Sequence, residues 1–169
     1  MRTLGNRSLI ALISFQTTFS TSVEIKESRK SAIKYRELSS RYKYMHLYNQ
    51  QKPTSVVNHI RSKQSDEIAI STITIAELEY GVSRSQHPDQ NRIALLEFLV
   101  PFIIMDFDQS AAALYGPIRT SLELIGTPIG PADLLLAAQA MSEKLVLVTN
   151  NEREFKRIDG LQIENWVRK

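Results

Sequence analysis

Cysteine is absent from this chain of 169 residues. Its absence excludes a disulfide framework, cysteine-ligated zinc and thiol nucleophiles. The longest apolar runs, such as FLVPFIIM, are too short to span a bilayer, and the N-terminus lacks the compact apolar region and cleavage site of a secretory signal. We therefore expect a cytoplasmic protein with no membrane partner.

Acidic residues are also absent from a long stretch near the N-terminus, because no Asp or Glu lies between Glu37 and Asp66. Residues 1–52 carry a net charge of +7 and residues 53–169 a net charge of −4. The basic pI of 9.2 therefore comes from the first third of the chain. A basic pI usually favours a nucleic-acid partner, but here it supports one only if the first third belongs to the folded domain.

From Lys52 onward, strand-like and helix-like segments alternate regularly. Such alternation predicts an α/β fold with a mostly parallel central sheet covered by helices on both faces. The apolar run LVLVT (145–149) has the composition expected of a central strand. Further strands are expected at 66–71, 103–107 and 161–166, and helices at 55–63, 74–82, 92–102, 109–125, 132–144 and 150–158, with a turn at 87–90 and a loop at 126–131.

Residues 1–51 do not continue this pattern. They are rich in Ser, Thr, Arg and Lys, and no clear cap or turn connects them to the rest. The run LIALISF (9–15) is compatible with a strand, and residues 23–38 with a helix. We expect a domain over 52–169 that lacks the usual first strand of its fold, and a separate segment over 1–51.

Three carboxylates follow strand-like runs at the starts of expected helices. Glu77 lies three residues after Thr74, which is the spacing of a capping box. Asp133 falls in the first turn of its helix, where a negative charge interacts favourably with the helix dipole. Glu154 fits a solvated surface charge. Taken one at a time, each residue is explained at least as well by a structural role as by a catalytic one.

Taken together, the three carboxylates favour a metal-dependent nuclease. Strand–helix junctions of a parallel sheet meet at one edge, and carboxylates gathered there repel one another unless a cation neutralises them. Oxygen ligands suit Mg²⁺ or Mn²⁺, which can activate water for attack on a phosphodiester. No serine elbow or phosphate-binding glycine loop offers a competing mechanism, and the three histidines lie outside every motif.

Three segments of this sequence resemble motifs of the PIN-domain ribonucleases, in particular the VapC-type toxins of bacterial toxin–antitoxin pairs. The segments ISTITIAELEYG, GTPIGPADLLLAAQA and VTNNEREFKRIDGLQIENW resemble the second, third and fourth motifs of that family, in order and spacing. The resemblance runs from about Lys52 to the C-terminus. It implies a three-layer PIN-like fold, Mg²⁺-dependent cleavage of RNA, a homodimer and a cognate antitoxin as partner. Some relatives cut initiator tRNA.

The resemblance also implies roles for individual residues. Glu77 and Asp133 would be metal-coordinating catalytic carboxylates, and Glu154 would be the acid beside the fourth motif's phenylalanine. Thr149 would be a supporting hydroxyl. Asn151 stands where many relatives carry an aspartate, and its role is either to bind metal through its carbonyl or to cap a helix.

The first motif of the family is missing. Relatives begin with a strand and a motif like LLDTNICIY, whose aspartate is a principal metal ligand, whereas this chain has RYKYMHLY over 41–48. Codons that encode these residues can be chosen so that a shift of one base reads Asp-Thr-Asn-Ile-Cys-Ile-Tyr. This favours a segment translated out of frame. The other interpretations of residues 1–51 are a disordered segment and a basic RNA-binding arm. We expect weak or no nuclease activity from the chain as written, and a domain that only dimerises or binds antitoxin is the alternative function.

Overall fold

Five parallel strands form the centre of the fold. The computed structural model describes residues 11–13, 54–63 and 67–167. The strands are β1 (Ala11–Ile13), β2 (Ile68–Ser71), β3 (Ile103–Met105), β4 (Val146–Val148) and β5 (Ile163–Glu164), arranged in the order β3-β2-β1-β4-β5. Every pairing between neighbouring strands is parallel. All carboxyl ends of the strands therefore lie at one edge of the sheet, where side chains from separate segments can meet.

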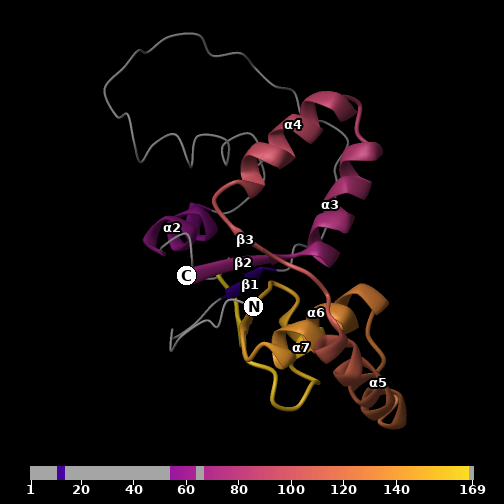
Figure 1. The fold of residues 1–169 in the computed structure, drawn as a ribbon. Helices are drawn as coiled ribbons and strands as arrows, with labels where there is room; N and C mark the ends of the chain where they lie inside the picture. The colour runs from indigo at the N-terminus through magenta and orange to yellow at the C-terminus, as the bar shows by residue number, and fades with distance from the viewer. Residues whose placement is uncertain (1–10, 14–53, 64–66, 168–169) are drawn as a thin grey trace, which may run out of the picture.

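Helices cover both faces of this sheet (Figure 1). One face carries α2 (Thr54–Ser62), α3 (Thr72–Ser83) and α4 (Pro88–Leu99). The other face carries α5 (Gln109–Leu124), α6 (Pro131–Ser142) and the one-turn helix α7 (Glu152–Phe155). This confirms the three-layer α/β architecture with a parallel central sheet. No helix among the described residues is both long and apolar enough to cross a bilayer.

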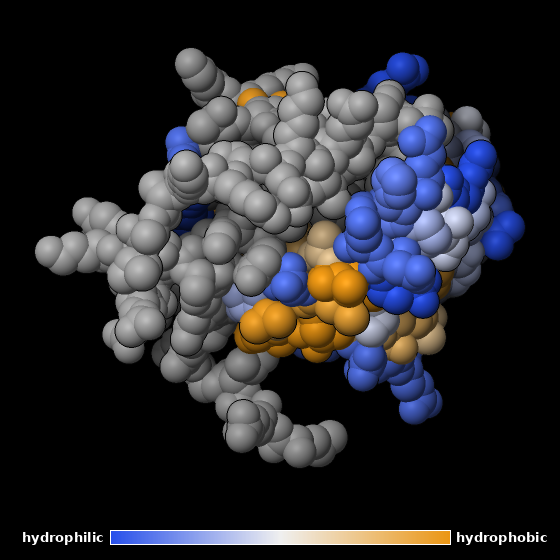
Figure 2. All heavy atoms as spheres, turned by 90° about the horizontal axis from the view of Figure 1, so that it is seen from above, coloured by the Kyte–Doolittle hydropathy of each residue, from blue (hydrophilic) through white to orange (hydrophobic). Residues whose placement is uncertain are grey.

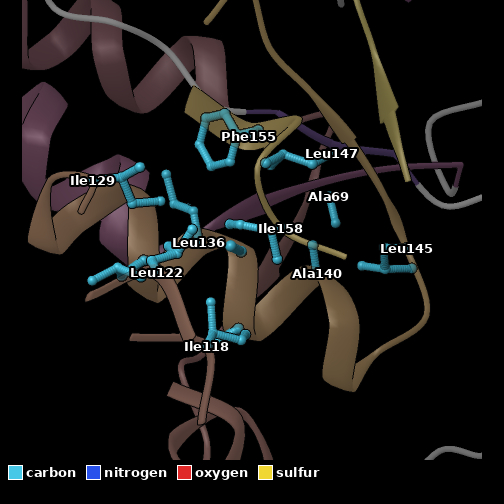
Figure 3. Close-up of a cluster of buried hydrophobic side chains, with 13 residues drawn as sticks. Ala69, Ile118, Leu122, Ile129, Leu136, Ala140, Leu145, Leu147, Phe155 and Ile158 are labelled. Carbon is cyan, nitrogen blue, oxygen red and sulfur yellow. The ribbon is translucent and has the colours of Figure 1, made fainter. Parts of the chain in front are cut away.

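The two faces of the sheet bury two separate apolar clusters, because side chains alternate along a strand. In β2, Ala69 joins the cluster under α5 and α6, whereas Ile68 and Ile70 join the cluster under α2, α3 and α4. In β4, Leu147 joins the cluster under α5 and α6, and Val148 joins the cluster under α2, α3 and α4. Figure 3 shows the first cluster, where side chains from α5, α6, α7 and the sheet converge. Both faces of β2 and β4 are thus used for core packing.

The central strand comes from the first third of the chain. β1, residues 11–13, pairs with β2 on one side and with β4 on the other. The sheet therefore differs from the expected domain over 52–169 without a first strand, because part of the apolar run 9–15 fills that position. It also differs from the expectation for LVLVT, since β4 lies one place from the centre. Residues 41–48 and the expected helix over 23–38 lie outside the described residues.

Two helices begin earlier than the sequence predicts. α3 starts at Thr72 and not at Thr74, because the hydroxyl of Ser71 accepts a hydrogen bond from the amide of Ile73 and caps the helix. α4 starts at Pro88, within the predicted turn 87–90, since proline is well suited to the first turn of a helix. Aspartate is a favoured cap residue, so the sequence predicts that Asp108 caps the helix expected at 109–125. The structure confirms this cap, because the Asp108 carboxylate accepts from the amide of Ala111 at the start of α5.

Candidate functional site

Asp133 lies in the first turn of α6, as the sequence predicts. The helix begins after Gly130, which has no side chain to cap it, and Pro131 occupies the first turn. Burial raises the pKa of the Asp133 carboxyl, a hydrogen bond from Asn151 acts in the opposite direction, and the nearby charges of Glu154 and Glu77 raise it further. Three carboxylates from three separate segments therefore interact electrostatically around Asp133.

Thr149 and Asn151 connect the end of β4 to this carboxylate. The buried hydroxyl of Thr149 accepts a hydrogen bond from the backbone amide of Asn151 at 3.0 Å. The side-chain amide of Asn151 then donates to Oδ2 of Asp133 at 3.3 Å. Asn151 is also the N-terminal cap residue of α7, but its side chain makes no capping hydrogen bond. The Asn151 side chain is thus directed to the carboxylate.

Glu77 does not form the capping box that its spacing from Thr74 predicts. Because Ser71 caps α3, Glu77 lies six residues after the cap, and the first turn of the helix contains no acidic residue. Capping pairs the cap residue with the third residue of the helix, so Glu77 is too far along to take part. The structural explanation for Glu77 is therefore wrong. What remains is a partly exposed carboxylate whose charge acts on Asp133.

Glu154 is not the solvated surface charge that the sequence also allowed. Its carboxylate pairs with the guanidinium of Arg157, at 3.0 Å from Nη1 and 3.4 Å from Nη2. Both side chains are about three-quarters buried. Paired contacts of this kind fix orientation as well as neutralising charge. Glu154 is therefore held in one direction by a cation of its own chain.

These residues fit part of a divalent-cation site and fall short of a complete one. Burial raises the pKa of the Asp133 carboxyl, and the charges of two acidic neighbours raise it further. A bound cation would relieve the repulsion between these carboxylates. However, the described residues contain no group of three or more His, Asp or Glu side chains placed to hold a metal ion. Two candidate oxygens are also engaged, since Asn151 donates to Asp133 and Arg157 to Glu154. Of the histidines, His59 stacks on Trp166 and His87 precedes α4, and neither is among the charges acting on Asp133.

Two buried polar residues, Ser71 and Gln139, were not predicted from the sequence. Gln139 and Ser71 are fully buried and hydrogen bond to each other through their side chains. Gln139 was visible as the only polar residue within the apolar run LLLAAQAM, and an amide in such a position needs partners. Its partners could not be identified, because they lie on strands distant in the sequence.

Comparison with known proteins gives consistent results. The sequence profile of the PIN domain family matches residues 44–161. Ribonuclease VapC2 of Rickettsia felis is 46% identical over 115 residues, which cover 68% of this chain and 86% of the relative. The tRNA(fMet)-specific endonuclease VapC of Shigella flexneri is 40% identical over 115 residues, with the same coverage of each chain.

Solved structures agree with the sequence relatives. The crystal structure of DNA-bound VapBC from Salmonella typhimurium aligns with a TM-score of 0.70 and 30% identity, over 94% of this chain and 99% of that one. The crystal structure of VapBC2 from Rickettsia felis bound to a DNA fragment from its promoter aligns with a TM-score of 0.66 and 42% identity, over 73% of this chain and 94% of that one. The β-α arrangement described above is therefore shared along nearly the whole length of a solved relative.

Proposed function

This chain belongs to the PIN-domain family, among the VapC ribonucleases of toxin–antitoxin systems, and on that premise we propose that its fold serves metal-dependent endonucleolytic cleavage of RNA in the cytoplasm. The observation that carries the proposal is the half-buried carboxylate of Asp133, to which the segment after β4 donates through Asn151 and whose pKa the charges of Glu154 and Glu77 raise. Relatives named as tRNA(fMet)-specific endonucleases favour a tRNA substrate.

Asp133 and Glu77 would hold Mg²⁺ or Mn²⁺. Such an ion supplies positive charge to the phosphodiester and lowers the pKa of water. Asn151 orients Asp133 through its amide, and Thr149 fixes the backbone of Asn151. Glu154 is a catalytic carboxylate, with Arg157 controlling its direction. Partial burial of Asp133 limits competing hydration of these groups and strengthens their interactions.

The sequence directly after β1 supplies no acidic residue to the centre of this edge. The first Asp or Glu after β1 is Glu24, eleven residues beyond Ile13, and a first-strand carboxylate is the group that the family's first motif supplies. Loss of one ligand from such a site costs orders of magnitude in rate. We therefore propose weak activity for this polypeptide and strong activity for a chain in which residues 41–47 are replaced by Asp-Thr-Asn-Ile-Cys-Ile-Tyr and that segment takes the strand position of residues 11–13.

The decisive experiment compares these two chains on purified tRNA and mRNA, with Mg²⁺ and with EDTA. The replaced chain should cleave, EDTA should stop it, and Asp133→Asn should lower the rate about a hundredfold or more. Glu143→Gln is the matched control, because it removes an exposed carboxylate from the far end of the same helix. A replaced chain that folds but does not cleave would refute the missing-ligand account. Robust cleavage by the original chain, unaffected by Asp133→Asn, would refute the site.

A domain that only dimerises and binds an antitoxin is the second candidate. Exposed apolar side chains favour it, because Ile93, Leu96 and Val100 share one face of α4 at helical spacing, and Tyr80 is exposed on the adjacent α3. Figure 2 views the molecule from the side of these two helices and shows apolar surface among polar side chains. Exposed apolar patches of this kind mark protein interfaces. Tight antitoxin binding with no RNA cleavage by either chain would establish this function.

A further inference from the structure

A buried polar network connects the two helices that carry Glu77 and Asp133. Gln139 of α6 accepts a hydrogen bond from the hydroxyl of Ser71 at 2.5 Å. Its amide nitrogen donates to the backbone carbonyls of Met105, at 3.2 Å, and Asp106, at 3.0 Å. Ser71 in turn accepts from the amide of Ile73 at the start of α3. One side chain thus contacts the carboxyl ends of two strands and the residue that caps the helix after one of them.

The placement of this network is specific. Ser71 is the last residue of β2, Met105 is the last residue of β3, and the two are partners in the strand register. Gln139 therefore bridges the final step of that strand pair from the helix above it. Glu77 lies six residues after Ser71, and Asp133 six residues before Gln139. At about 1.5 Å of rise per residue, each carboxylate is on the order of 9 Å along its helix from the network.

Core packing alone does not require glutamine at position 139. The residue lies between alanines in the interior of α6 and is 1% exposed. An apolar side chain there would avoid the cost of burying an amide. Both amide hydrogens and the carbonyl oxygen of Gln139 have partners, and fully satisfied buried networks restrict a core to one arrangement. The arrangement restricted here is the position of α3 relative to α6.

We infer that Gln139 is a positioning residue, which acts through Ser71 to hold Glu77 of α3 at a fixed place relative to Asp133 of α6. This rests on the proposed function of those two carboxylates. Removing the amide should let the start of α3 shift while leaving every carboxylate in the chain. The substitution should therefore weaken cation binding by more than its effect on the free energy of unfolding explains.

The test uses the full chain and Mn²⁺, whose binding is measured by its EPR signal. Gln139→Met should weaken Mn²⁺ binding about tenfold. It should also speed hydrogen exchange of the Ile73 amide relative to amides in α5. Ile118→Val and Leu122→Ala are controls, since both remove buried apolar atoms of α5 from the cluster that α5 and α6 share and span a range of stability losses. Neither control should change Mn²⁺ binding more than about twofold, because neither side chain takes part in the hydrogen bonds of the network.

Ser71→Ala provides a second variant if Gln139→Met does not fold. It removes the hydrogen bond to Gln139 and should weaken Mn²⁺ binding in the same direction. The double variant should bind no worse than the weaker single variant, because both changes remove one coupled unit. Loss of Mn²⁺ affinity that follows stability equally in variants and controls would overturn the inference. If the unmodified chain binds no Mn²⁺, the proposed cation site is wrong, and the hydrogen exchange of the Ile73 amide alone tests the role of Gln139. Faster exchange in Gln139→Met but not in the controls supports the positioning role. Equally fast exchange in the controls refutes it.

Discussion

Asp133→Asn should stabilise the protein at neutral pH even though it removes a carboxylate of the proposed site. Burial raises the pKa of Asp133, and the charges of Glu154 and Glu77 raise it further, so the folded state disfavours the ionised form. Asparagine has nearly the same shape and no charge. Its amide oxygen can still accept from Asn151. Folded protein therefore gains stability when the charge is removed, as active-site groups often oppose stability.

The sign and size of the effect follow from proton linkage. With its pKa raised in the folded state, Asp133 binds more protons folded than unfolded between the unfolded value, about 3.9, and the higher folded value. The protonated form of Asp133 thus makes its full contribution to the free energy of unfolding below about pH 3.9, and this contribution is lost as pH rises through the folded pKa. The advantage of the variant should grow across that window by at most about 1.4 kcal/mol per pH unit, the limit for a single proton, and then level off.

Urea unfolding from pH 3.5 to 8 would measure this advantage. The chain has one tryptophan, Trp166, which is buried and provides a fluorescence signal for unfolding. Comparing the two proteins at each pH cancels the titration of the groups that do not interact with Asp133. Glu143→Gln controls for removing a negative charge from the same helix. An advantage of Asp133→Asn that is independent of pH, or that shrinks as pH rises, would refute the reasoning, as would an equal pH dependence in the control.

Two further variants test how α7 is held. Phe155→Ala should lower the free energy of unfolding by about 3–5 kcal/mol, because the ring is fully buried where α7 meets the first apolar cluster (Figure 3). A loss below about 1.5 kcal/mol in urea unfolding would contradict this. Val167→Ala, at an exposed position, is the control. Arg157→Gln should lower the free energy of unfolding by about 1 kcal/mol, near the upper end for an ion pair that is only partly buried. It should also free the Glu154 carboxylate, which carboxyl NMR would detect as a loss of fixed orientation. An unchanged Glu154 signal would show that Arg157 does not hold this carboxylate.

How much the sequence could predict depends on the range of the interactions. Asp108 and Asp133 were placed correctly because capping and first-turn preferences act within a few residues. The start of α3 was misplaced because Thr74 and Ser71 offer similar caps, and the difference is that the Ser71 hydroxyl also binds Gln139, 68 residues away. The pairing of Glu154 with Arg157 is local, but i,i+3 charges are so common on exposed helices that spacing alone could not indicate burial.

The central strand shows the limit of local patterns most clearly. Residues 11–13 occupy the sheet position between β2 and β4, yet no Asp or Glu follows them in the sequence before Glu24. A parallel sheet of this topology needs an apolar segment between β2 and β4, and the run 9–15 satisfies that need by composition alone. The chemical need is separate, because the proposed function requires a carboxylate at the carboxyl end of this strand. A strand that supplies no acid completes the sheet and leaves the proposed site short of a ligand. The Asp-Thr-Asn replacement at 41–47 can supply that acid only if its segment takes the strand position that residues 11–13 hold, so it tests a change of strand together with the chemistry.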